Sequence, residues 1–143
     1  MQRQWVTIKA IIQDAEGRVL LIREIKDGKV RWWELPGGRM DVGEEPFDTL
    51  RRELQEEIGV DMDVHNGELI HVEHWGLRGD ALNNPIVGIF YYLKITEPLE
   101  ISFRSNHDKV VWVHPLHDEF PEPLSEVTRR TCEAVCRKLY PEE

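Results

Sequence analysis

The feature that most constrains the fold of this chain is the stretch at residues 37–60, which opens with two glycines. Its second half predicts a short helix. Pro46 suits the first helical position, where its missing N–H costs little, and Gly59 suits the left-handed position just past the C-terminus. Apolar residues recur between them at helical spacing and predict one buried face: Phe47, Leu50, Leu54 and Ile58.

Three glutamates crowd the last turns of this helix, because Glu56 and Glu57 follow Glu53 by three and four positions. Like charges at that spacing destabilise a helix by about 0.2–0.5 kcal/mol per pair, and an exposed carboxylate near a helix C-terminus costs about 0.3–1 kcal/mol. Arg52 can pair with Glu53 or Glu56 and still leaves a surplus of negative charge. A hard divalent cation such as Mg²⁺ or Mn²⁺ would offset that surplus, whereas the alternative is an acidic face exposed to water.

The residues before the helix favour a metal-binding site over an exposed acidic face. The glycine pair follows an apolar run and is expected to open a loop that leads to the helix. Five residues separate Gly38 from Glu44, and seven separate Glu44 from a charged segment that reads Arg52-Glu53-Leu54-Gln55-Glu56-Glu57-Ile58-Gly59-Val60. This pattern resembles the signature box of the Nudix hydrolases, the MutT-like family, and Leu35-Pro36-Gly37 precedes it as the family prefers.

The resemblance implies a fold and a reaction. The fold would be the α/β fold of the Nudix type, an α/β/α sandwich in which helices pack on a mixed β-sheet. The reaction would be the hydrolysis of a nucleoside diphosphate linked to another moiety, in which water attacks a phosphorus of the diphosphate bridge. A nucleoside triphosphate, removed in a house-cleaning role, is one such substrate. The cofactor would be Mg²⁺ or Mn²⁺.

The resemblance also assigns roles to single residues. Glu53, Glu56 and Glu57 match the family's metal-binding glutamates, and Glu53 is the candidate base that accepts the proton of water. Glu44 and Arg52 would hold the loop against the helix. Four residues would contact the substrate phosphates, two through close backbone approach and two through guanidinium groups: Gly37, Gly38, Arg23 and Arg39. The alternatives for these four are a plain turn and solvated surface arginines.

One position departs from the family pattern. Asn106 stands about six residues before Trp112, where many members carry a glutamate. A base or further metal ligand from that segment would have to be Asp108 or Glu100. The proline and the tyrosine that mark the ADP-sugar and dinucleoside-polyphosphate branches are also missing from their usual spacings after the box. Their absence favours a nucleoside triphosphate or an unassigned substrate.

Other side chains have two interpretations. Trp32, Trp33 and Trp75 can stack on a base, although core packing is expected for at least two of them. Specificity should lie in the segments at 26–33 and 78–85. The histidines show no metal-ligand spacing and are interpreted as structural or exposed. The two cysteines are expected to be reduced and to pack as small hydrophobic residues: Cys132 and Cys136.

Composition indicates which classes of partner this protein can bind. A net charge of −9 argues against a long nucleic acid, although a nucleotide held at a metal site is compatible with it. The sequence has no apolar run of about 18 residues and no signal-peptide pattern, which predicts no membrane partner and a cytoplasmic location. Its length suits a single domain over residues 1–143. Nudix hydrolases often dimerise, so a homodimer is the candidate assembly.

The hydrophobic pattern predicts strands at 5–12, 18–23, 68–75, 86–95 and 110–113, turns at 14–17 and 26–29, a loop at 79–85 and a second helix at 124–139. This order favours helices packed on a mixed sheet. Two further functions compete with catalysis: a catalytically inactive nucleotide-binding or sensor module of the same fold, and a structural domain with an acidic helix. The intact set of glutamates argues against the first, and melting that depends on divalent ions would exclude the second.

Overall fold

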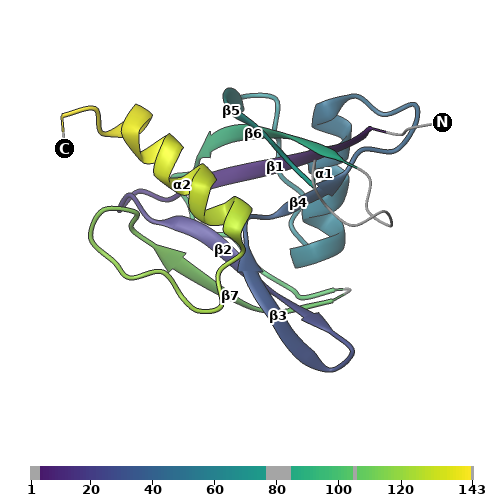
Figure 1. Cartoon of the computed structure of the whole chain (residues 1–143), viewed down its shortest axis with the longest axis horizontal. Coiled ribbons are helices and arrows are strands. Elements are labelled where there is room, and N and C mark those ends of the chain that lie inside the picture. The colour runs from purple at the N-terminus through teal and green to yellow at the C-terminus, as the bar shows by residue number, and fades with distance from the viewer. Residues whose placement is uncertain (1–3, 77–84, 105, 143) are drawn as a thin grey trace.

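The computed structural model describes residues 4–76, 85–104 and 106–142. Within these residues the chain forms strands and two helices, which follow one another in the order β1 (Trp5–Gln13), β2 (Val19–Lys26), β3 (Lys29–Glu34), β4 (Gly37–Arg39), α1 (Pro46–Ile58), β5 (Glu68–Trp75), β6 (Ile86–Lys94), β7 (His107–Val113) and α2 (Glu126–Leu139) (Figure 1). Neither helix is long and apolar enough to cross a membrane, as far as the described residues go.

The sheet has two parts that meet at the β1–β2 hairpin. In one part, β1 pairs in parallel with β6 along its whole length, and β5 pairs antiparallel with β6. In the other part, β2 pairs antiparallel with both β3 and β7. The two parts are joined where Gln13 pairs with Val19. Farther from the hairpin, β1 pairs instead with β4, so that Thr7 lies opposite Arg39 and Lys9 opposite Gly37.

The two faces of β1 belong to different cores, because side chains alternate across a strand. Ile8, Ala10 and Ile12 pack in one apolar cluster with α1. Ile11 packs on the opposite face in a second cluster with α2, which crosses in front of the sheet in Figure 1. This is the predicted α/β/α sandwich, a mixed sheet with a helix on either side.

Helix α1 has the predicted bounds. It begins at Pro46 and ends at Ile58, and Gly59 follows in the left-handed conformation with φ 67°. The predicted face is buried, since Leu50, Leu54 and Ile58 are fully inaccessible and Phe47 packs half-buried on the same cluster. The apolar stripe therefore fixes the rotation of the helix, and with it the direction of the three glutamates.

Helix α2 packs through the expected apolar positions. Cys132 and Val135 are buried, and three partly buried residues join them against the sheet: Leu124, Val127 and Leu139. Ser125 caps the helix by accepting a hydrogen bond from the backbone N–H of Thr128 at 3.1 Å. Cys132 forms no disulfide, and burial raises its pKa to about 12, which leaves this thiol unreactive at neutral pH.

Several expected boundaries were wrong. The glycine pair does not open a loop, because residues 37–39 form β4 and are held by pairing with β1. Strand β3 was not expected, and β2 and β7 are longer than the apolar pattern indicated, since pairing between them extends through polar residues such as Lys109. The loop expected at 79–85 falls almost wholly on residues 77–84, which lie outside the described residues.

Candidate active site

The end of α1 meets β4 through two carboxylates and two glycines. Glu57 is buried, and its Oε1 accepts a hydrogen bond from the backbone N–H of Gly37 at 2.7 Å. Glu53 lies against Gly38 so closely that a Cβ added there would be 2.4 Å from its carboxyl carbon. A side chain at position 38 would therefore displace the carboxylate of Glu53, while at position 37 the backbone N–H itself faces Glu57.

Arg52 is the centre of an ion-pair network that joins the helix to the loop before it. Its Nε and Nη2 bond the two carboxylate oxygens of Glu44 at 2.7 and 2.9 Å, and its Nη2 also donates to the carbonyl of Arg39 at 3.0 Å. Its Nη1 lies 3.0 Å from Glu53 and 3.2 Å from Glu56. Arg52 thus pairs with both glutamates that the sequence offered as alternatives, while Glu44 holds the guanidinium in place.

The geometry around Glu44 leads to a pH-dependent prediction. Arg52, the amide of Asp41 and the hydroxyl of Thr49 all donate to this carboxylate and hold its pKa at about 2. Because the pKa is lower in the folded state, this stabilisation is present above the unfolded value of 4.5 and is lost as the pH falls from there toward 2. Glu44→Gln should therefore lower Tm by a few degrees at pH 7. The difference from the wild type should shrink in melting curves recorded from about pH 5 toward pH 2; a constant difference would contradict this account.

A second group of charges lies behind Glu57. Lys9 is buried, and its Nζ donates to Glu34 Oε1 at 3.1 Å and to the carbonyl of Leu35 at 2.8 Å. His107 is also buried, with its Nε2 3.3 Å from Glu34 Oε2 and 3.7 Å from Glu57 Oε2. We call Lys9, Glu34 and His107 the buried charge cluster. It forms where β1, β3 and β7 come together at the diverging part of the sheet.

The carboxylates of the site differ in the direction in which their pKa values are shifted. Burial raises the pKa of Glu57 well above its ordinary value, although Lys9 and the amide of Gly37 oppose this. Burial also raises the pKa of Glu53, with Arg52 opposing. In Glu34 the burial effect is outweighed by Lys9 and His107, which lower its pKa to about 2. Nearby positive charge thus does not offset the effect of burial on Glu53 and Glu57, whereas Lys9 and His107 offset it fully for Glu34.

The two arginines expected to hold phosphates have other partners in this structure. Arg23 makes a two-point ion pair with Asp108, at 2.9 and 2.6 Å, and lies 5.8 Å from the ring centre of Trp33. Arg39 stacks on Trp5, with its guanidinium carbon 3.6 Å from the ring centre. Asp108, offered as a substitute base, is therefore paired with an arginine rather than directed at the glutamates.

The glutamates of α1 supply a donor set that suits a divalent cation. Among the described residues, no three His, Cys, Asp or Glu side chains converge as a preformed metal site. The cause is visible in the contacts, since Arg52 holds Glu53 and Glu56 while the amide of Gly37 holds Glu57. The chemistry nevertheless fits, because carboxylate oxygens are the ligands that Mg²⁺ prefers and two of these groups are under-compensated. A bound cation would compete with Arg52 for Glu53 and Glu56.

A cavity of about 310 Å³ opens beside the buried charge cluster. Lys9 and Glu34 line it together with the rings of Trp32 and Trp75 and the first turns of α2. Trp33, by contrast, is buried in the apolar cluster under α2. We call this space the tryptophan cavity.

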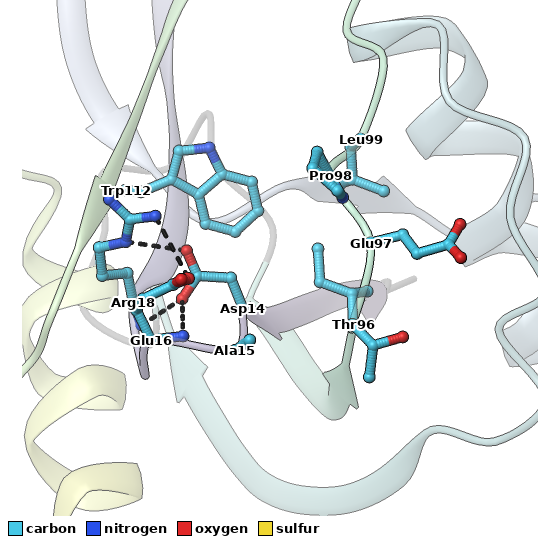
Figure 2. A pocket seen from close by; sticks show the side chains of 10 residues that line it. Asp14, Ala15, Glu16, Arg18, Thr96, Glu97, Pro98, Leu99 and Trp112 are labelled. Carbon is cyan, nitrogen blue, oxygen red and sulfur yellow. Dashed lines mark hydrogen bonds and ion pairs between the residues drawn. The ribbon is translucent and has the colours of Figure 1, made fainter.

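A second hollow, of about 340 Å³, lies near the β1–β2 turn (Figure 2). Trp112 and Pro98 line it together with Asp14 and Arg18, which are hydrogen-bonded to each other at 2.9 Å. None of the three glutamates of α1 contributes to its lining, so we assign it no role in the site.

Sequence reasoning missed the buried charge cluster. Lys9 interrupts an otherwise apolar and β-branched strand, and that interruption was the available signal. Glu34 directly precedes the Leu35-Pro36-Gly37 segment but had no spacing to mark it. The sequence groups His107 with the other histidines as structural or exposed; its side chain is buried, and its position next to Glu57 had no signal in the sequence.

The comparisons with known proteins agree with this geometry. The NUDIX domain family matches residues 3–133. The chain belongs to the Nudix family. It is 36% identical over 135 residues to an 8-oxo-dGTP diphosphatase of Haemophilus influenzae, covering 91% of this chain and 93% of that protein. It is 32% identical over 122 residues to a MutT-like protein of Streptomyces ambofaciens, covering 85% and 70%.

Solved structures place this Nudix hydrolase in the same fold. A MutT NUDIX hydrolase from Burkholderia pseudomallei superposes with a TM-score of 0.77 at 26% identity, over 94% of this chain and 99% of that one. Some other curated relatives are matched over only about half of their own length. The chain is therefore an enzyme of the pyrophosphohydrolase type, and its own substrate and metal are matters for proposal.

Proposed function

We propose that this Nudix hydrolase is a metal-dependent pyrophosphohydrolase that acts on nucleoside triphosphates. The observation that carries the proposal is the packing of two under-compensated carboxylates, Glu53 and Glu57, against the backbone of Gly37 and Gly38. Such groups can accept a cation and a phosphate at one place, because the glycines allow both to approach closely.

We propose a separate role for each of the charged residues at the end of α1. Glu53, Glu56 and Glu57 would hold Mg²⁺ or Mn²⁺, which supplies charge stabilisation for the phosphates and a lowered pKa for attacking water. Glu53 is the proposed base, since burial raises its pKa and strengthens its hold on a proton. Glu44 would keep Arg52 in position once Arg52 releases Glu53 and Glu56 to the cation.

Arg23 and Arg39 are proposed as phosphate ligands that exchange partners when substrate binds. Arg23 would leave Asp108, and Arg39 would turn from Trp5 toward the glycine pair that precedes it. A guanidinium group binds phosphate oxygens in a two-point manner, as it binds a carboxylate, so for Arg23 the exchange conserves the number of charge-assisted hydrogen bonds.

The substrate class rests on the relatives and the cavity. Relatives of this chain include an 8-oxo-dGTP diphosphatase and a CTP pyrophosphohydrolase, both of which are named for nucleoside triphosphates. The tryptophan cavity offers two aromatic rings beside Glu34, where a base can stack. A cytoplasmic location, a homodimer and a single-domain extent over residues 1–143 stay predictions of the sequence.

The test of the function is product analysis. Purified protein should be incubated with Mg²⁺ and a panel of nucleoside triphosphates, nucleotide sugars, dinucleotides and coenzyme A. Release of pyrophosphate and a nucleoside monophosphate from a triphosphate would support the proposal. Tight nucleotide binding without turnover would instead support the inactive sensor module, and turnover of other compounds alone would reassign the substrate.

Metal and pH dependence give a further expected result. Activity should vanish in excess chelator and return with Mg²⁺ or Mn²⁺, and it should rise from about pH 6 to about pH 9. The reason is that metal competes with protons for Glu53 and Glu57, whose pKa values are both raised, and that the nucleophile must be deprotonated. Initial rates across buffers of equal ionic strength would measure it. Added Mg²⁺ should also raise Tm by mass action, and full activity in chelator would refute the mechanism.

A further inference from the structure

Glu57 is a buried carboxylate whose direction is set by two contacts within the protein. Its Oε1 accepts a hydrogen bond from the amide of Gly37 at 2.7 Å, and its Oε2 faces Nε2 of His107 at 3.7 Å. We propose that His107 is a positioning residue for metal binding: Glu34 holds its ring, and the ring fixes the second oxygen of Glu57, so that this carboxylate is already oriented when a cation arrives. This inference rests on the proposed function, because that function makes Glu57 a metal ligand.

The ring of His107 is held by Glu34. The His107 side chain is 7% exposed, and its Nε2 lies 3.3 Å from Oε2 of Glu34. Glu34 has a pKa of about 2 and is therefore ionised at neutral pH, which assigns the ring N–H to Nε2. The same N–H attracts Oε2 of Glu57. That contact is longer than a hydrogen bond, so it acts on the carboxylate through electrostatic attraction.

The other ring nitrogen of His107 gives an independent reason to look for a role. Nδ1 is buried and has no hydrogen-bond partner among the residues that the structure describes. A buried polar atom without a partner costs stability, so an apolar side chain would suit this position better if packing were its only demand. Retaining a histidine here is explained by what Nε2 does, and the groups that face Nε2 are Glu34 and Glu57.

The contact between Glu57 and Gly37 is held in place without the histidine. The buried ammonium of Lys9 donates to the carbonyl of Leu35 at 2.8 Å, and β4 pairs with β1 where Lys9 lies opposite Gly37. Both interactions limit movement of the amide that Oε1 of Glu57 contacts. The first oxygen of this carboxylate is thus fixed by the backbone, and His107 is the group that fixes the second.

An oriented carboxylate binds a cation more tightly than a mobile one, because less side-chain freedom is lost on binding. Each carboxylate oxygen has two lone pairs, so Glu57 keeps capacity for a cation beside its contacts with Gly37 and His107. Partners that orient a metal ligand contribute about tenfold to 100-fold to metal affinity. We therefore expect His107 to act on the affinity for the cation.

The test measures metal affinity apart from catalysis. The metal-free full chain should be titrated with Mn²⁺, and the free ion followed by electron paramagnetic resonance. His107→Leu removes the N–H and should weaken Mn²⁺ binding by about tenfold to 100-fold. His107→Gln places an amide N–H near the position of Nε2 and should restore most of the affinity. His74→Leu, which replaces an exposed histidine on β5, is the matched control and should leave the affinity unchanged.

A third substitution guards against loss of folding in His107→Leu. His107→Asn keeps a polar amide, but its side chain is one methylene shorter than glutamine, so its N–H falls short of Glu57 and the affinity should be low. Equal Mn²⁺ affinity of the folded asparagine and glutamine variants would overturn the inference. A lower Tm of metal-free His107→Leu with unchanged Mn²⁺ affinity would overturn it as well, because that is the result expected of a purely structural histidine.

The outcomes separate this inference from the proposed function. Triphosphate hydrolysis by the wild type, together with unchanged Mn²⁺ affinity in the His107 variants, would overturn the inference and sustain the function. Affinity lost in His107→Leu and regained in His107→Gln, in a protein that hydrolyses no triphosphate, would refute the function and leave the inference standing. A wild type that binds no Mn²⁺ would overturn both.

Discussion

Glu57→Gln is expected to lower kcat by about 10³-fold, roughly 4 kcal/mol of transition-state stabilisation, while leaving the fold intact. Glutamine keeps the size of the side chain and can still accept the hydrogen bond from the Gly37 amide. It removes the negative charge with which this buried position would hold a cation. Steady-state rates at saturating Mg²⁺ would measure the loss. Glu133→Gln, which neutralises an exposed carboxylate on α2, should retain full activity.

The stability of this variant separates a functional glutamate from a structural one. Burial raises the pKa of Glu57 in the folded state, so its ionised form opposes folding once the pH exceeds the unfolded value of 4.5. The metal-free Glu57→Gln protein should therefore melt no lower than the wild type at about pH 7, and the wild type should gain stability as the pH falls toward about 5. A clearly lower Tm for the metal-free variant would mean that Glu57 is held in place for its contacts with Lys9 and His107.

Gly37→Ala is expected to lower the free energy of unfolding by about 4 kcal/mol or more, the sum of a strained backbone and an overpacked contact. Gly37 has φ +131°, and an added Cβ would lie 2.1 Å from the carbonyl oxygen of Ile8 on the paired strand β1. Neither atom can move away, because β4 and β1 are hydrogen-bonded at this point. Urea unfolding of the purified variant would measure the change.

Gly28→Ala is the matched control for this substitution. Gly28 has φ +74° in the turn between β2 and β3, and a Cβ there would meet no atom within 4 Å. It isolates the cost of the left-handed backbone, about 1–2 kcal/mol. If Gly37→Ala proved no more costly than Gly28→Ala, the close approach of β4 to β1 would not be a determinant of stability.

The sequence by itself determined helix α1 and its orientation. Pro46 and Gly59 mark its ends, and the apolar stripe marks its buried face, because both signals act within a few residues along the chain. The spacing of the box around that helix was also enough to predict the α/β/α sandwich and the family. It did not distinguish the three glutamates, of which Glu57 is buried while the side chain of Glu56 is 54% exposed.

The tertiary structure alone decided what surrounds those glutamates. Lys9 and Glu34 are 25 residues apart in sequence, Glu34 and His107 are 73 apart, and Glu57 reaches an amide 20 residues away. Their meeting depends on β1 and β2 diverging after the hairpin and on β3 and β7 both pairing with β2. Local sequence patterns do not predict such pairings, because the partner of a strand is set by contacts between residues that are far apart in the sequence. For the same reason the charge of Glu34, the pKa of Glu57 and the floor of the tryptophan cavity follow from the assembled sheet.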